Sequence, residues 1–113
     1  MFSFLRRLNP ATPSIEVADL AARLSAGSIR VLDVREEYEF KSGHVPGALN
    51  VPVKKLPDKI TKLKHDKPYA VICQSGNRSR GATNYLLDQG FEGAVSVKGG
   101  TSAWARSGKA VIR

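Results

Sequence analysis

Cys73 is the only cysteine of the 113-residue chain, and the residues around it favour chemistry at its thiol. It follows the apolar, β-prone run Tyr69–Ile72 and precedes a polar loop, residues 74–79, which leads into a helical pattern. Small and polar residues in such a loop let successive backbone N–H groups turn inward, and the following helix adds its positive end. This field favours the thiolate over the thiol. The sequence therefore predicts a nucleophile that handles an anion or carries negative charge itself.

The alternative is a buried structural cysteine at the end of a strand, which is common for a lone cysteine. The loop behind Cys73 contains Gly76 and Arg78, and a second arginine, Arg80, follows it directly. A glycine-containing loop with two cations beside the thiol favours a functional role over a structural one.

The spacing between cysteine and arginine separates two chemistries that use this layout. A cysteine phosphatase needs a cysteine, five intervening residues and then an arginine that clamps the phosphate. In this chain Ser79 stands at that position, Arg78 comes one residue too early, and Arg80 comes one residue too late. The spacing therefore favours attack on a sulfane sulfur, with the cysteine carrying a persulfide, over attack on phosphorus.

Apolar periodicity predicts the elements that position the cysteine. Strands are predicted at residues 29–34, 48–51, 69–73 and 94–97, and helices at residues 14–24, 36–42, 56–63, 80–89 and 99–104. Strands that alternate with helices imply an α/β fold with a mostly parallel central sheet and helices on both faces. Ligands of such sheets bind beyond the carboxyl ends of the strands, which is where Cys73 lies.

Two other predicted strand ends carry polar residues. Asp33 and Arg35 lie two positions apart and therefore point to the same side. We expect them to pair with each other or with the loop after Cys73, in a supporting role. Lys98, followed by Gly99 and Gly100, either borders the mouth of the site or belongs to a plain turn.

The remaining candidates have simpler interpretations. His44 is interpreted as a turn histidine and His65 as an exposed one, and Trp104 is expected to pack in the core or to wall the pocket. Two distant histidines and one cysteine predict no metal site.

Length and composition indicate a single domain, with residues 1–13 as a lead-in and residues 14–113 as the domain. No apolar run approaches the roughly 20 residues that a membrane helix needs. The basic residues near the start follow a short apolar stretch, which is the reverse of a secretory signal. One cysteine forms no internal disulfide, which suits a reducing compartment, so we expect a cytoplasmic protein.

The chain is strongly basic, with a net charge of +8 and a pI near 10.0. Six lysines are concentrated in one stretch: Lys54, Lys55, Lys59, Lys62, Lys64 and Lys67. They form either a solvated surface or an attractive surface for anions, such as an acidic protein partner. Nucleic-acid binding is not expected, because no aromatic residues are interleaved and no nucleic-acid motif is present.

Four stretches in order resemble the single-domain rhodanese family, whose members are thiosulfate sulfurtransferase-like. They are "VLDVREEYEF" (31–40), "GHVPGALNVP" (43–52), "VICQSGNRSRGA" (71–82) and "VKGGTSAWARSG" (97–108). The resemblance covers roughly residues 14–112 and is specific because all four stretches occur in this order and spacing. It implies a rhodanese-like three-layer α/β domain.

The resemblance also implies an activity and a set of site residues. Cys73 would be the sulfur-carrying nucleophile, Arg78 would attract an anionic donor, and Ser79 would open the helix after a six-residue active loop. The loop residues expected to surround the substrate are Gln74, Ser75, Gly76, Asn77, Arg78 and Ser79.

The reaction expected from the resemblance moves sulfane sulfur from a donor such as thiosulfate to cyanide or a thiol. It requires no metal and no organic cofactor. The alternatives are a sulfur-relay or binding module that serves a partner protein and, less favoured, a phosphatase or arsenate reductase with the longer loop of the same fold.

Overall fold

The computed structural model describes residues 11–113 as an alternation of short strands and helices. In chain order the elements are β1 (Ser14–Ile15), α2 (Val17–Ser25), β2 (Arg30–Asp33), α3 (Glu37–Ser42), β3 (Leu49–Asn50), the 3-10 turn η1 (Val53–Lys55), α4 (Leu56–Lys59), the 3-10 turn η2 (Ile60–Lys62), β4 (Tyr69–Ile72), α5 (Asn77–Asp88), β5 (Val95–Val97) and α6 (Gly100–Arg106). Most of the predicted lead-in, residues 1–10, lies outside the described residues. The domain boundary at residue 14 therefore stays a prediction.

The five strands form one sheet in the order β1-β5-β4-β2-β3, and every neighbouring pair is parallel. This confirms the predicted parallel sheet. Asp33 at the end of β2 is in register with Ile72 at the end of β4. The segments that follow these two strands therefore leave the sheet at the same edge, which is where Cys73 begins its loop.

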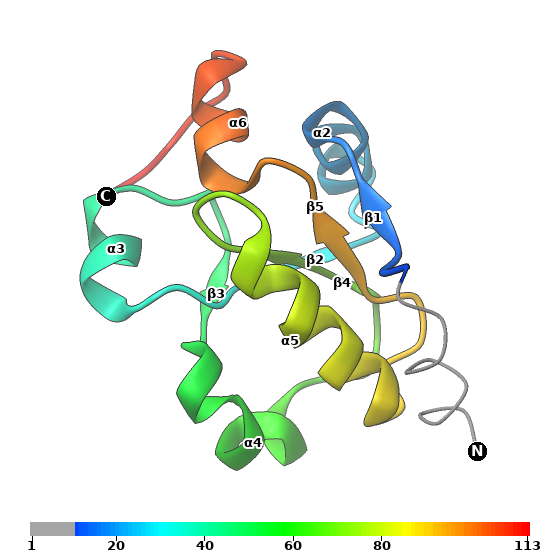
Figure 1. Cartoon of the computed structure of the whole chain (residues 1–113). Helices are drawn as coiled ribbons and strands as arrows, with labels where there is room; N and C mark the ends of the chain where they lie inside the picture. Colours follow the sequence, from blue (N-terminus) through cyan, green and yellow to red (C-terminus); the bar gives the residue numbers. More distant parts are fainter. Residues whose placement is uncertain (1–10) are drawn as a thin grey trace.

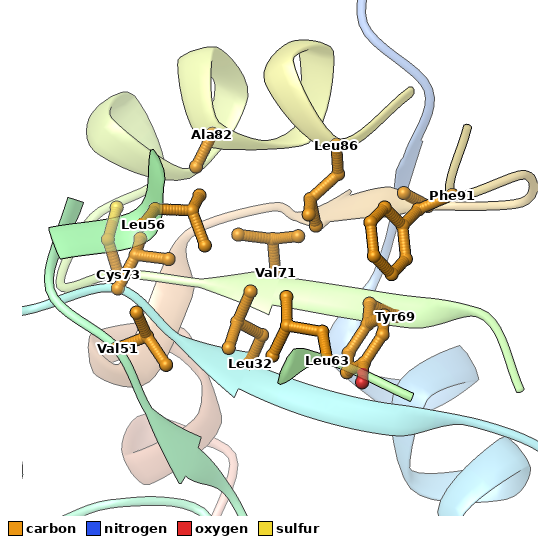
Figure 2. Packing of buried hydrophobic residues seen from close by; sticks show 12 residues of the cluster. Leu32, Val51, Leu56, Leu63, Tyr69, Val71, Cys73, Ala82, Leu86 and Phe91 are labelled. Atoms are coloured by element: carbon orange, nitrogen blue, oxygen red, sulfur yellow. The ribbon is translucent and has the colours of Figure 1, made fainter. Parts of the chain in front are cut away.

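Helices cover both faces of the sheet and make the predicted three layers (Figure 1). Side chains alternate along each strand, so one strand contributes to two cores. Leu32 and Val71 pack with Leu86 of α5 on one face, whereas Leu20 of α2 and Trp104 of α6 belong to the cluster on the other face. Figure 2 shows the first cluster beneath α5, with Cys73 and Tyr69 at its opposite ends. The thiol thus lies where a packed core meets the carboxyl edge of the sheet.

The predicted helix over residues 14–24 is wrong at its start. Ser14 and Ile15 form β1, which is in register with Ser96 and Val97 of β5, and the helix begins only at Val17. The local apolar spacing is helical, but pairing with a distant strand and burial of Ile15 decide the conformation of its first residues.

The predicted helix over residues 56–63 is replaced by η1, the four-residue α4 and η2. Pro57 lies in the first turn of α4, where its missing N–H costs nothing. A helix that continued from η1 into α4 would place that proline in its interior and would lose a backbone hydrogen bond, so η1 and α4 are separate elements.

Helix α5 begins at Asn77, three residues before the start predicted at residue 80. Its N-cap is Gly76, whose φ of +110° lies in the left-handed region that favours glycine. Arg78 and Ser79 therefore belong to the first turn of the helix, and the irregular loop is confined to residues 74–76.

Candidate active site

The sulfur of Cys73 lies in a cradle of hydrogen-bond donors formed by its own loop. Cys73 is buried, with 1% of its surface exposed, at the end of β4. The backbone N–H of Gly76 donates to Sγ over 3.1 Å and that of Ser79 over 3.3 Å. The Ser79 hydroxyl lies 3.5 Å from the same sulfur. Several donors thus converge on one atom, an arrangement that stabilises negative charge there.

The cradle changes the acidity of the thiol. Burial by itself raises the pKa of Cys73 because it disfavours the charged form. Hydrogen bonds from the Ser79 hydroxyl and from the backbone N–H groups of Ser79, Gly76 and Ser75 act in the opposite direction and prevail. The pKa of Cys73 therefore lies below its usual value, which increases the share of nucleophilic thiolate at neutral pH.

Ser79 is itself held by a second buried serine that the sequence analysis missed. Its Oγ lies 2.8 Å from Oγ of Ser96 in β5 and 3.1 Å from the carbonyl oxygen of Gly76. Both serines are buried. The only sequence signal for Ser96 was a polar residue between two valines of a predicted strand. The contact ties the first turn of α5 to the neighbouring strand and fixes the hydroxyl beside the thiol.

Asp33 and Arg35 form a buried ion pair that also reaches the active loop. Nη2 of Arg35 lies 2.8 Å from Oδ2 of Asp33, and 2% of Arg35 and 0% of Asp33 are exposed. Arg35 also donates to the carbonyl oxygen of Gly43 over 2.7 Å and to Oε1 of Gln74 over 2.9 Å. Both contacts considered for this pair are therefore present, and the guanidinium connects β2, the end of α3 and the loop.

The side chain of Gln74 is engaged by the protein at both ends of its amide. Oε1 accepts from Arg35, and Nε2 donates to Oγ of Ser102 in α6 over 2.8 Å. Gln74 therefore joins Arg35, in the segment after β2, to α6 across the base of the loop. Its predicted contact with substrate stays a prediction.

The start of α6 supports the loop from beneath. The N–H of Thr101 donates to the carbonyl oxygen of Cys73 over 2.8 Å, and that of Ser102 donates to Gln74 over 3.1 Å. Gly100 has a φ of +59°, and a Cβ there would lie 2.7 Å from the carbonyl oxygen of Gln74. Only glycine allows this close approach. Gly100 thus allows the start of α6 to lie directly against the base of the loop, which is more than a plain turn requires.

Arg78 is bound to an acidic residue that the sequence analysis did not single out. Its Nη1 and Nη2 donate to the two carboxylate oxygens of Glu39 in α3 over 2.7 and 2.9 Å. Arg78 lowers the pKa of Glu39 to about 2. Glu39 also accepts from the backbone N–H of Glu36 in a capping box at the start of α3. The charge of Arg78 is therefore paired within the protein.

A cavity of about 400 Å³, here named the loop-flanking cavity, lies beside the active loop. Ser75, Gly76 and Asn77 line it from the loop side, and the cations Arg80 and Lys98 line it as well. Lys98 lies 3.3 Å from the carboxylate of Glu16, and both side chains are exposed. Arg80 thus lies near the active loop, as part of the lining of this cavity. Its spacing from the cysteine had excluded it only as a phosphate clamp.

The histidines and the tryptophan stand apart from the sulfur. His44 Nδ1 is 2.7 Å from the carbonyl oxygen of Phe40, while His65 is exposed and stacks on Phe91. Trp104 is buried and donates through Nε1 to Ala110. Among residues 11–113, no group of three or more His, Cys, Asp or Glu side chains is placed to hold a metal ion.

Two surface features were expected from composition. All six lysines of the stretch from Lys54 to Lys67 are exposed. No helix within the described part of the chain combines the length and the apolar character needed to cross a membrane.

The family model for the rhodanese-like domain matches residues 16–107. The chain belongs to the rhodanese-like family. It is 36% identical over 90 residues to the thiosulfate sulfurtransferase GlpE of Shewanella oneidensis, a match that covers 80% of this chain and 89% of that protein. The resemblance based on four sequence stretches is thereby confirmed.

Solved rhodanese structures share the fold. A rhodanese-related protein from Thermoplasma volcanium superposes with a TM-score of 0.81 at 39% identity, over 88% of this chain and 97% of that one. The human single-domain sulfurtransferase TSTD1 superposes with a TM-score of 0.76 at 28% identity, over 85% and 97%. The rhodanese-like protein described here is therefore of the sulfurtransferase type.

Proposed function

We propose that this rhodanese-like protein moves sulfane sulfur from thiosulfate to cyanide or a thiol through a persulfide on Cys73. The main support for this proposal is the geometry around Cys73. The backbone N–H groups of Gly76 and Ser79 both donate to its buried sulfur, and the pKa of the thiol is lowered. Donors fixed in this way stabilise the anionic sulfur without rearrangement during the reaction. The relative from Shewanella oneidensis is named a thiosulfate sulfurtransferase, and this name supports thiosulfate as the donor.

The reaction balances in two displacement steps. The Cys73 thiolate attacks the outer sulfur of thiosulfate; a new S–S bond forms, the old one breaks, and its electron pair leaves with sulfite. The acceptor, cyanide or a thiolate, then attacks the outer sulfur of the persulfide. Thiocyanate or an acceptor persulfide leaves, and the electron pair returns to Cys73 as thiolate.

The pairing of Arg78 with Glu39 supports sulfur transfer over phosphate chemistry. A phosphatase needs an arginine that is free to clamp the phosphate oxygens, and this one is held bidentately by a carboxylate. The cytoplasm remains the proposed location because a reducing compartment keeps the single thiol reduced.

A sulfur-relay module that receives sulfur from a partner protein is the second candidate. The exposed lysine stretch favours it, because six cations suit an acidic partner surface. Both candidates use the same persulfide and differ only in the donor.

Mass spectrometry of the intact protein after exposure to thiosulfate tests the proposal. We expect the addition of one sulfur atom to Cys73 and its removal by cyanide. No addition to folded protein would contradict thiosulfate as donor. Addition from a persulfide-bearing protein alone would support the relay module instead.

The lowered pKa of Cys73 predicts that its thiolate persists at lower pH in the folded protein than in the unfolded chain. Thiolate ultraviolet absorbance, titrated with and without urea, measures both transitions on the same single cysteine. Because the pKa is lower in the folded state, the thiolate stabilises the fold above the unfolded pKa. That stabilisation is lost as the pH falls through the folded pKa.

Ser79→Ala is the matched variant for this titration. It removes one hydroxyl beside the sulfur and keeps the backbone donors, so the folded transition should move to higher pH. A folded transition at or above the unfolded one in the parent protein would contradict the donor cradle.

Arg78→Ala and Glu39→Gln should change thiosulfate kinetics in opposite directions. If Arg78 attracts the anionic donor, its loss raises KM more than it lowers kcat. Glu39→Gln removes the paired carboxylate and frees the positive charge, so KM should fall, most clearly at low salt. Steady-state kinetics at two ionic strengths measure both. An equal rise in KM for the two variants would show that the ion pair serves to hold the loop against α3.

A further inference from the structure

A second cavity, of about 370 Å³, opens at the edge of the sheet opposite the active loop. Arg30 and Tyr69, the first residues of β2 and β4, line it, whereas Cys73 follows the last residue of β4. In Figure 2, Tyr69 lies at the far end of the core cluster from Cys73. We name this space the amino-edge cavity; it is separate from the loop-flanking cavity and from the thiol.

The walls of the amino-edge cavity are partly apolar. Leu24, Leu49, Leu63 and Tyr69 are among its lining residues. Leu49 is 49% exposed, one of the few large apolar side chains of residues 11–113 that face solvent to this extent. A ligand with an apolar body would remove part of this surface from water, and that burial favours binding.

Basic side chains also line the cavity. Lys62, Lys64 and Lys67, three of the six clustered lysines, contribute to it and are exposed. Of the basic residues that line it, only Arg30 has a carboxylate within ion-pair distance among residues 11–113, namely Asp66 at 2.6 Å. The three lysines therefore leave a net positive potential at this partly apolar cavity.

We propose that the amino-edge cavity binds a small amphipathic organic anion, with an aromatic or short aliphatic body and a sulfonate or carboxylate head. Small-molecule pockets begin at about 300 Å³ and combine an apolar lining with few polar groups. An apolar cavity of about 150 Å³ holds one benzene ring, so this one has room for a body of about two fused rings. The ammonium groups of the three lysines then pair with the anionic head of the ligand. This inference does not rest on the proposed sulfur transfer.

Three probes of matched shape or charge test the chemistry of the ligand by calorimetric titration. Naphthalene-2-sulfonate should bind, and its neutral counterpart naphthalene-2-sulfonamide should bind at least about ten-fold more weakly. Inorganic sulfate, which lacks the apolar body, should give no measurable heat. Equal binding of the sulfonate and the sulfonamide, or binding of sulfate as tight as that of the sulfonate, would overturn the proposal.

Two triple variants of equal charge test the location. Lys62→Gln/Lys64→Gln/Lys67→Gln changes the lining of the cavity. The control changes three lysines of the same stretch that do not line it: Lys54→Gln, Lys55→Gln and Lys59→Gln. The first should weaken naphthalene-2-sulfonate at least about ten-fold and the second less than about two-fold. Equal losses, or none in either, would overturn the site.

The apolar wall has its own test. Leu49→Asn, which removes the apolar side chain without adding charge, is placed at a half-exposed position, so the fold should survive, as circular dichroism checks. The variant should lose naphthalene-2-sulfonate binding, and unchanged affinity would contradict the proposed wall. Competition with thiosulfate in a sulfur-transfer assay would place the probe at Cys73 and would equally overturn the proposal.

Discussion

Cys73→Ser is expected to reduce thiosulfate:cyanide sulfur transfer to background, a loss of at least roughly a thousand-fold. A serine hydroxyl is barely ionised at neutral pH, and its oxygen forms no persulfide. The donors of Gly76 and Ser79 stabilise negative charge on the sulfur, and the neutral hydroxyl of the variant carries no such charge. Thiocyanate formation measures the activity, and mass spectrometry after thiosulfate exposure should show no added sulfur.

Cys73→Ala is the matched control, because it removes the thiol without supplying a hydroxyl. Both variants should fold, since serine and alanine fit within the volume of the buried cysteine. Thermal unfolding checks this. Sulfur transfer retained by a folded Cys73→Ser protein would refute the proposed nucleophile.

Arg35→Leu is expected to cost about 3–5 kcal/mol of unfolding free energy, the usual range when one member of a buried ion pair is removed. The variant keeps Asp33 ionisable and fully buried but without its cation. It also removes the donors to Gly43 and Gln74, so the active loop loses one of its supports. For a domain of this size each kcal/mol shifts Tm by roughly 4–8 °C. Urea and thermal unfolding measure the loss.

Arg30→Leu is the matched control for Arg35→Leu. Arg30 forms a bidentate pair with Asp66 at 2.8 and 2.6 Å, but the two side chains are 36% and 47% exposed. Water screens this pair, so its removal should cost far less than removal of the buried one. Equal losses for the two variants would show that burial of the Asp33–Arg35 pair is not what makes it important.

The architecture was largely predictable because its signals are local. The apolar runs of β2, β4 and β5 and the periodic pattern of α5 appear in contiguous residues, and short strands alternating with helices imply a parallel sheet. The four family stretches, confirmed by the match over residues 16–107, are local as well. The start of the helix predicted at residue 14 was wrong because distant residues decide its conformation. β1 is only two residues long and exists through its pairing with β5.

Local residue types and spacing, by themselves, were sufficient to place Cys73 at a strand end before a loop whose N–H groups turn inward, and to indicate the rhodanese family. Apart from the Asp33–Arg35 pair, the partners of the site residues depended on tertiary structure. Glu39 lies 39 positions from Arg78, and Ser102 lies 28 positions from Gln74. Strand register and helix packing bring such side chains together, and no local propensity encodes either. For the same reason, only the folded chain shows which three of the six lysines share one cavity with Leu49 and Tyr69.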